Sequence, residues 1–277
     1  MTQTAQTTRR ITHRTRGSQH GFIRRMVSPG DLGESMKPFI FLDFVHGHVE
    51  PGAGFGWHPH SGIATLTYSL NADAAYEDTA GQKGRVEATG LEWMRAGGGT
   101  WHQGFIHPRE ETVTSFQLWV ALPPGVEDGP PEGVYVPPGQ VPQVGNVRVL
   151  LGEYGAQRNP ITTPSSINYL DVALGAGETW TYSPPAGHDV AWAFVYRGRA
   201  RVAGESITGE LVVFEDGPGD VTLEAAEASR VLFGSAAKHA HRLVLGTYSV
   251  HTNRESLARG EARIREVRDE LRRAGRV

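Results

Sequence analysis

Short segments of alternating apolar and polar residues recur along most of the chain. In residues 63–70 one face is polar, and the apolar positions on the other are Ala64, Leu66, Tyr68 and Leu70. Residues 112–122 alternate in the same way, with apolar positions at Phe116, Leu118 and Val120. A period of two is typical of β-strands, and frequent glycine and proline break the chain between them. The pattern predicts an all-β protein built from antiparallel sheets.

One segment has the helical period instead. Residues 254–273 carry an apolar stripe among charged residues, and Gly275 lies just beyond its end as a stop signal. The stripe consists of Leu257, Ile264, Val267 and Leu271. We expect a C-terminal α-helix whose many arginines form a solvated face.

The chain divides into two strand-rich halves. Residues 123–164 are rich in proline and glycine, which disfavours helix and central strand. The pattern of residues 189–205 echoes that of residues 62–81, which indicates a weak internal duplication. We therefore predict a flexible arm (1–15), an N-terminal β-barrel domain (16–135), a crossover (136–165), a C-terminal β-barrel domain (166–250) and the helical segment (251–277).

Composition narrows the function classes. The 277 residues include 27 basic and 30 acidic side chains, for a net charge of −3, so no basic field argues for direct nucleic acid binding. Cysteine is absent, which excludes disulfides, thiolate nucleophiles and cysteine-based zinc sites. No apolar run is long enough to span a membrane, and the polar, arginine-rich start lacks the apolar middle of a secretory signal. We expect a cytoplasmic protein.

Histidines supply the candidate chemistry. His58 and His60 flank Pro59 just before the strand at residues 63–70, and His102 follows a triple glycine. If that strand extends back to Gly56, both imidazoles share the parity of Leu66 and point inward. Two histidines on one strand and a third on a later strand would suit a divalent transition metal.

The remaining histidines have simpler interpretations. The pair His46 and His48 is expected in a solvated loop, and the pair His239 and His241 in a loop beside the last strands. His188 has no His-x-His companion, so we expect the second half to be metal-free. The run 97–99 of three glycines lacks the lysine and helix of a phosphate-binding loop, which favours a tight β-turn.

Four blocks of sequence together resemble the N-terminal cupin of the pirin family. They are KPFIFLDFV, PGAGFGWHPHSGIATLTY, EDTAGQKG and LEWMRAGGGTWH, within residues 16–122, and LVLGTYSVHTNRES near the end resembles the segment before the family's last helix. The resemblance implies a bicupin, two jelly-roll barrels with one mononuclear metal, usually iron, in the first. It also implies either quercetin dioxygenase activity or a role as a cofactor of transcription regulators.

Carried over from the family, the metal ligands are His58, His60 and His102. The family's fourth ligand, a glutamate, is replaced by Gly104, and a second common acid is replaced by Ala64. Either the site is an open three-histidine face, which we favour, or another side chain substitutes; the candidates are Gln103, His107, Glu110 and Glu111. Predicted pocket walls are Trp57, Tyr68 and Trp101, with Gln103 beside them.

Two function classes remain open. The first is a dioxygenase of quercetinase type, in which Fe(II), or else nickel, copper, zinc or manganese, binds oxygen and a small aromatic or enolic substrate. The second is a non-catalytic metal-binding module with a protein partner, which the missing glutamate favours.

Overall fold

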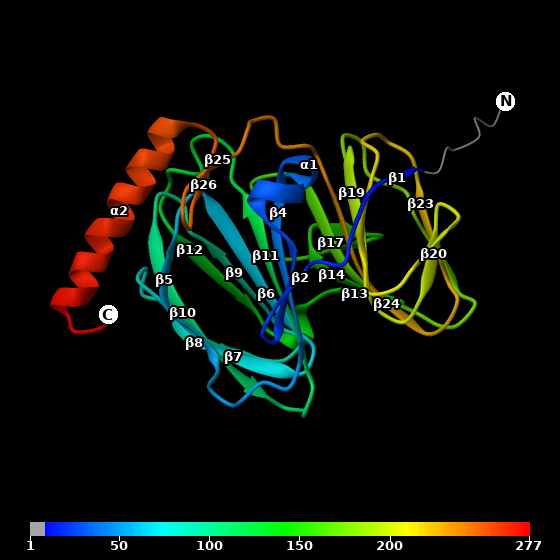
Figure 1. Ribbon diagram of the computed structural model, residues 1–277, viewed down its shortest axis with the longest axis horizontal. Coiled ribbons are helices and arrows are strands. Elements are labelled where there is room, and N and C mark those ends of the chain that lie inside the picture. Colours follow the sequence, from blue (N-terminus) through cyan, green and yellow to red (C-terminus); the bar gives the residue numbers. More distant parts are fainter. Residues whose placement is uncertain (1–8) are drawn as a thin grey trace. The chain divides into compact units, whose positions relative to one another are not determined.

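The computed structural model describes residues 9–277, which form mostly β-strands and one long helix (Figure 1). The chain separates into two compact units. The histidine unit consists of Ser18–Val141 and His239–Val277, and the second unit consists of Pro142–Lys238 with the described residues up to Gly17. The predicted mostly-β class is confirmed, whereas the hydrogen-bonded sheets are open and not closed into barrels.

The histidine unit contains a larger and a smaller sheet. The larger sheet holds, in spatial order, β12 (Glu132–Val136), β9 (Leu91–Arg95), β6 (Ile63–Ser69), β11 (Val113–Ala121), β4 (Phe39–Gly47), β3 (Ile23–Val27) and β2 (Ser18–His20). The smaller sheet holds β5 (Gly54–His60), β10 (Thr100–Pro108), β7 (Ala72–Asp78) and β8 (Lys83–Val86). All neighbouring strands in both sheets are antiparallel.

The second unit repeats this arrangement. Its larger sheet holds β1 (Ile11–Thr15), β22 (Leu211–Phe214), β19 (Val190–Arg197), β24 (Ser229–Ala236), β17 (Ile167–Leu174), β14 (Val147–Leu151) and β13 (Gln143–Val144). Its smaller sheet holds β18 (Thr179–Tyr182), β23 (Val221–Ala225), β20 (Ala200–Val202) and β21 (Glu205–Ile207). The eight strands β17 to β24 therefore occupy the same places, in the same chain order, as β4 to β11. The internal duplication predicted from the sequence is confirmed at the level of strand order.

Short elements complete the two units. They are η1 (Pro29–Gly33), α1 (Glu34–Met36), η2 (Pro138–Gln140), β15 (Glu153–Tyr154), β16 (Gln157–Arg158), β25 (Val244–Leu245) and β26 (Val250–His251).

Two predicted segments differ from expectation. Within the arm predicted over residues 1–15, Ile11–Thr15 is not flexible, because it forms β1 and pairs with β22; residues 1–8 lie outside the described residues. Arg14 reinforces this pairing through ion pairs with Glu205 and Glu210. The predicted crossover over 136–165 contains β14, whose apolar sequence VRVLL is free of proline and can join the sheet beside β17.

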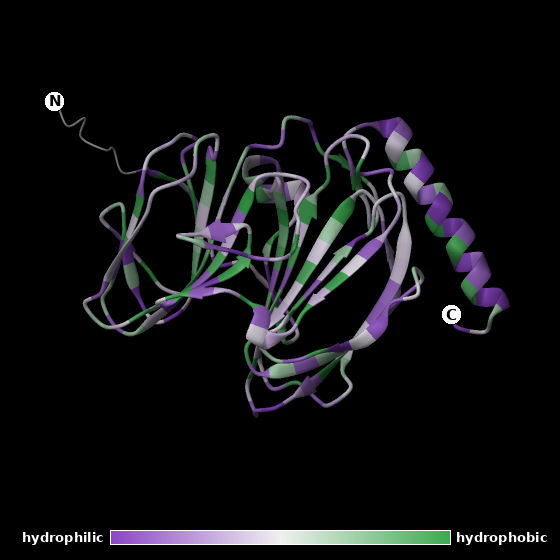
Figure 2. Ribbon diagram, turned by 180° about the vertical axis from the view of Figure 1, so that it is seen from behind, coloured by the Kyte–Doolittle hydropathy of each residue, from purple (hydrophilic) through white to green (hydrophobic). Residues whose placement is uncertain are grey.

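The predicted helix is confirmed as α2 (Arg254–Arg273). Asn253 caps its first turn by accepting a hydrogen bond from the Ser256 amide at 2.8 Å, and Gly275 follows its end with a φ of +68°. Figure 2 shows hydrophobic and hydrophilic stretches alternating along α2, and the stripe residues Val267 and Leu271 are buried. Among the described residues, no helix has the length and apolar character needed to cross a bilayer.

Candidate metal centre

A cavity of about 310 Å³ lies between the two sheets of the histidine unit. Strands of both sheets line it, including β5 and β10 from the smaller sheet and β6 and β11 from the larger one. His58, His60 and His102 all open into this cavity.

The three predicted ligands come together because β5 and β10 are antiparallel neighbours. His102 lies directly opposite His58 in the ladder, and His60 lies two residues farther along the same face. The ring centroids of His58 and His102 are 4.2 Å apart, and His60 lies 5.1 Å from each. One ring nitrogen from each side chain lies within 4.8 Å of the others. Within residues 9–277 this is the one group of three or more histidine or acidic side chains with such spacing.

Burial keeps these imidazoles neutral. Desolvation lowers the pKa of His58, and it lowers the pKa of His60 to about 3, with neighbouring His58 adding to the effect. The pKa of His102 is lowered well below its usual value by burial and then by the other two histidines. Neutral imidazole is the form that binds a metal.

Backbone carbonyls set the tautomers of two rings. The Nδ1 atom of His58 lies 2.7 Å from the carbonyl oxygen of Gly56, and that of His60 lies 3.1 Å from the carbonyl oxygen of Tyr248. A carbonyl can only accept, so Nδ1 carries the proton and Nε2 is free to bind a metal.

The donor set therefore fits a divalent transition metal. The Nε2 atom of His102 is buried and has no hydrogen-bond partner among the described residues. Buried polar atoms are normally paired, so an unpaired ring nitrogen beside two others points to a ligand that all three share. Imidazole suits iron, nickel, copper and zinc, and the histidines alone do not select among them.

The predicted inward face of β6 is wrong. Thr65, Thr67 and Ser69 line the cavity, whereas Leu66 and Tyr68 are buried away from it. The histidines lie on β5 in the smaller sheet, and Ser61 and Gly62 form a corner before β6 joins the larger sheet. Gly62 has a φ of +74°, and a Cβ there would lie 2.0 Å from the Val250 carbonyl oxygen, so this corner requires glycine. Because of this corner, His60 and Leu66 do not belong to one continuous strand, and their shared parity does not place them on the same face.

Of the four residues predicted to form the pocket wall, only Gln103 lines the cavity. Gln103 borders the cavity, but its amide donates to Glu77 at 3.1 Å. Trp57 and Trp101 do not line it: Trp57 lies under the guanidinium of Arg276, and Trp101 Nε1 donates to the Ile264 carbonyl on α2. The side chains that do form the aromatic wall are Phe41, Phe55, Tyr76, Phe105, Phe116, Trp119 and Tyr248.

The two replaced acids occupy different environments. Gly104 lines the cavity, so a glutamate there would reach it, whereas Ala64 is fully buried and outside the lining. Among the proposed substitutes, His107, Glu110 and Glu111 do not line the cavity, and Glu110 accepts a hydrogen bond from Asn71. None of the four joins the group formed by the three histidines.

Three histidines outside the candidate site, His46, His48 and His188, have partners of their own. His46 lies within β4 and not in the predicted loop, and it contacts Thr114; His48 follows the strand and pairs with Glu50, and both rings are exposed. Both ring nitrogens of His188 contact serine hydroxyls, Ser166 at 2.7 Å and Ser235 at 2.9 Å. In β18 and β23, the equivalents of β5 and β10, the buried cross-strand pairs are hydrophobic, Trp180 with Leu223 and Tyr182 with Val221, and they stand where the histidine unit has imidazoles.

Several polar residues of the cavity were not predicted from the sequence. Glu92, Thr67 and Gln117 lie on its wall, and burial raises the pKa of Glu92 to about 7. The available signal was the polar half of each alternating strand, because the parity with Leu66 places only the apolar half toward the interior.

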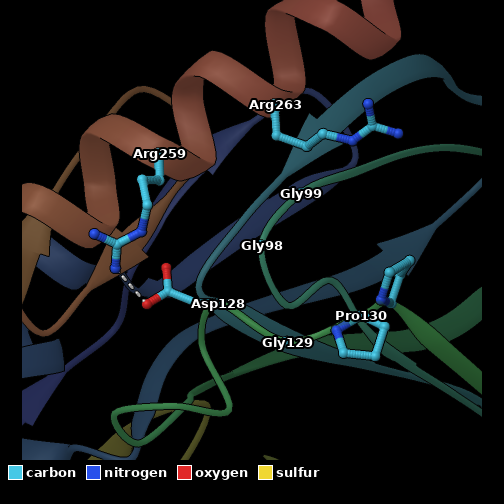
Figure 3. Close-up of a pocket in the computed structure, with 8 residues that line it drawn as sticks. Gly98, Gly99, Asp128, Gly129, Pro130, Arg259 and Arg263 are labelled. Atoms are coloured by element: carbon cyan, nitrogen blue, oxygen red, sulfur yellow. Dashed lines mark hydrogen bonds and ion pairs between the residues drawn. The ribbon is translucent and has the colours of Figure 1, made fainter.

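A second cavity lies where α2 crosses the triple glycine (Figure 3). The amide of Gly98 donates to the Gly129 carbonyl and that of Gly99 to the Ala96 carbonyl, so neither is free to bind phosphate. Arg259 pairs with Asp128 at 2.7 Å across this cavity. The predicted tight turn is confirmed, and a Cβ on Gly99 would come within 3.2 Å of Arg263.

Comparisons with known proteins agree with this architecture. The family model described as Pirin matches residues 21–120. A pirin-like protein of Caulobacter vibrioides is 32% identical over 76% of this chain and 79% of its own length. A protein of Pseudomonas aeruginosa provisionally named a quercetin 2,3-dioxygenase is 31% identical over 88% of this chain and 89% of its own length.

Solved structures share the fold. The crystal structure of quercetin 2,3-dioxygenase from Acinetobacter baumannii superposes with a TM-score of 0.84 at 23% identity, covering 97% of this chain and 98% of that one. The bacterial pirin YhhW from Escherichia coli, in complex with nickel(II), superposes with a TM-score of 0.66 at 21% identity, covering 84% and 99%. Strand order, histidine geometry and sequence similarity thus agree, and the chain belongs to the pirin family.

Proposed function

We propose that this protein is a metal-dependent dioxygenase of quercetinase type, with Fe(II) held by His58, His60 and His102. The observation that carries the proposal is the convergence of three neutral imidazoles at the wall of one cavity. The provisional name of the P. aeruginosa relative supports the same reaction class. Bicupin barrels and a second unit without metal are part of this proposal.

The cavity suits a flat substrate. Phe41 and Trp119 stack with ring centroids 4.0 Å apart and planes within 9°, and Trp119 lies 4.7 Å from His60. Phe55 and Tyr248, both about half exposed, also line the cavity and offer further aromatic surface. Aromatic faces would hold a planar compound by offset or edge contacts next to the histidines.

The backbone orients two of the three histidines. His58 and His60 donate through Nδ1 to backbone carbonyls, which fixes their rings and directs Nε2 toward the shared position. The iron, when bound, would supply oxygen chemistry and act as a Lewis acid toward a substrate hydroxyl. Because Gly104 offers no side chain, the room that a fourth protein ligand would take is left for the substrate.

The absence of a carboxylate at Gly104 favours a second candidate function. A carboxylate beside the metal would be a natural base for a substrate hydroxyl, and none of the three histidines can replace it while it binds the metal. The alternative is a non-catalytic metal-binding module that acts on a protein partner.

Elemental analysis and oxygen uptake test the proposal together. We expect about one metal ion per purified chain, its loss in His102→Ala, and its retention in the exposed control His46→Ala. Anaerobic reconstitution with Fe(II) should give oxygen uptake with a panel of flavonols. Bound metal without uptake would leave the regulatory module as the better function, and a protein that takes up no metal would refute the site itself.

A further inference from the structure

Five polar side chains form a row across the larger sheet of the histidine unit. They are cross-strand neighbours in register: Glu92 on β9, Thr67 on β6, Gln117 on β11, Asp43 on β4 and Arg25 on β3. All five line the cavity that contains the three histidines. We call this set the polar row.

Hydrogen bonds and an ion pair join neighbouring side chains of the polar row. Arg25 forms an ion pair with Asp43 at one end. At the other end, the hydroxyl oxygen of Thr67 lies 2.9 Å from Oε2 of Glu92 and 3.0 Å from Oε1 of Gln117. One hydroxyl has one proton, so it cannot donate to both oxygens. Both contacts are satisfied if a protonated Glu92 donates to Thr67 and Thr67 donates to Gln117.

This series of hydrogen bonds leaves one donor, the side-chain amide of Gln117, without an acceptor. The Nε2 atom of Gln117 is buried and has no hydrogen-bond partner among the described residues. The protonated form of Glu92 that this arrangement needs is consistent with its desolvation at the cavity wall, which raises its pKa to about 7, with a smaller contribution from Asp78. A buried amide group without a partner beside a cavity is the mark of a ligand contact.

The polar row and the histidines are close enough for one planar molecule to reach both. Trp119, which contacts His60, is two residues along β11 from Gln117, and this spacing corresponds to about 7 Å along a strand. The stacked rings of Trp119 and Phe41 lie between the two polar regions of the cavity wall. A planar molecule held against these rings could therefore reach both ends.

We propose that the polar row is a second binding subsite, in which the Gln117 amide donates a hydrogen bond to an oxygen at the end of the substrate remote from the histidines. This inference rests on the proposed function, which places the other end of the same substrate at the metal. It restricts the substrate class to flat aromatic compounds that carry oxygen substituents at both ends. Glu92 and Thr67 are positioning residues, because they orient the amide and do not contact the substrate oxygen.

A pair of flavonols tests the subsite. Quercetin and 3-hydroxyflavone share the hydroxyl and ketone that can chelate a metal, but only quercetin carries hydroxyls on its outer rings. Binding is measured anaerobically, by absorbance titration of the full-length, metal-loaded protein. We expect quercetin to bind at least tenfold more tightly, and Gln117→Met to remove this preference while leaving the affinity for 3-hydroxyflavone unchanged.

Two further variants separate orientation from general disruption. Glu92→Gln keeps a donor toward Thr67 and should retain the preference, whereas Thr67→Val breaks the chain and should lose it. Gln140→Met, at an exposed glutamine of the same unit, is the matched control and should behave as the unmodified protein.

The outcomes distinguish this inference from the proposed function. A preference that survives in Gln117→Met, equal affinities in the unmodified protein, or no binding of either flavonol would overturn the subsite. If both flavonols bind with equal affinity and both support oxygen uptake, the subsite is refuted and the dioxygenase proposal stands. Selective quercetin binding that depends on Gln117, without oxygen uptake after iron loading, would support the subsite and refute the dioxygenase.

Discussion

The Nδ1 atom of His60 lies 3.1 Å from the carbonyl oxygen of Tyr248, a residue 188 positions later in the chain. A proposed metal ligand is thus oriented by the C-terminal segment. A buried network holds that segment in place: Ser61 donates to Ser249 at 2.8 Å and contacts Nε2 of His251 at 2.9 Å. Glu127 accepts hydrogen bonds from the amide and hydroxyl of Thr252.

Removal of the Glu127 carboxylate should therefore weaken metal binding from a distance. Glu127 is fully buried, and one of its oxygens lies 3.3 Å from Nδ1 of His251 without a hydrogen bond. We expect Glu127→Ala to reduce stability by about 1–3 kcal/mol, because the amide and hydroxyl of Thr252 lose their buried acceptor. Metal affinity should fall roughly 10–100-fold, as when a residue that supports a ligand is lost. Urea unfolding and competition with a chelator measure the two effects.

The matched control is Glu132→Ala. Glu132 pairs with Arg95 at 2.9 Å but is half exposed, and such pairs contribute about 0–1 kcal/mol. Unchanged metal affinity in Glu127→Ala would contradict the proposed link between the C-terminal segment and His60.

Gly260 on α2 should resist a substitution that normally stabilises helices. A Cβ at this position would lie 2.4 Å from Oγ of Ser61 and 2.6 Å from Nε2 of His251. In an open helix, Gly→Ala gains about 1 kcal/mol, but here overpacking should cost about 1–3 kcal/mol. Thermal unfolding of Gly260→Ala, compared with Ala258→Gly on the exposed face, measures the difference. A more stable Gly260→Ala protein would show that α2 is not packed closely against Ser61.

Gly104→Glu should restore a fourth ligand. A Cβ at Gly104 would have ordinary contact with the Ala75 carbonyl at 3.6 Å, and its φ is one that other residues adopt. We expect metal affinity to rise on the order of tenfold, the scale of single supporting residues at metal sites. Ala64→Glu is the contrasting variant: its side chain would enter the buried face away from the cavity and cost several kcal/mol. Equal metal affinity in Gly104→Glu and the unmodified protein would contradict this assignment.

Glu92 should make stability depend on pH. Its pKa is about 7 in the folded protein against an ordinary 4.5, so the folded state keeps a proton that the unfolded state loses. Its contribution is therefore complete below pH 4.5 and is lost as the pH rises through 7. The slope is about 1.4 kcal/mol per pH unit within that window.

Glu92→Gln cannot ionise and should remove this slope. We expect the variant to be less sensitive to pH between 5 and 7 and more stable than the unmodified protein at pH 8, by about 2–3 kcal/mol. Urea unfolding at a series of pH values provides the measurement, with the exposed Glu132→Gln as control. Parallel pH profiles for the unmodified protein and Glu92→Gln would contradict a proton held at this position.

Local patterns were sufficient for several features of this protein. The period of two predicted the strands, the apolar stripe and Gly275 predicted α2, and the sequence motifs pointed to His58, His60 and His102. These features depend on residues close in sequence, or on one strand pairing with its neighbour. Their signals are therefore present in short stretches of the chain.

Tertiary structure decided which face of each strand meets the cavity. Both faces of β6 and β11 are largely buried, so an apolar and a polar face can each lie inside, and alternation does not distinguish them. The corner at Ser61 and Gly62 moves the chain from one sheet to the other and changes the parity between His60 and Thr67. Contacts such as Tyr248 with His60, or the five members of the polar row, join residues far apart in sequence. Only the fold brings these residues together, because cross-strand register depends on the whole sheet.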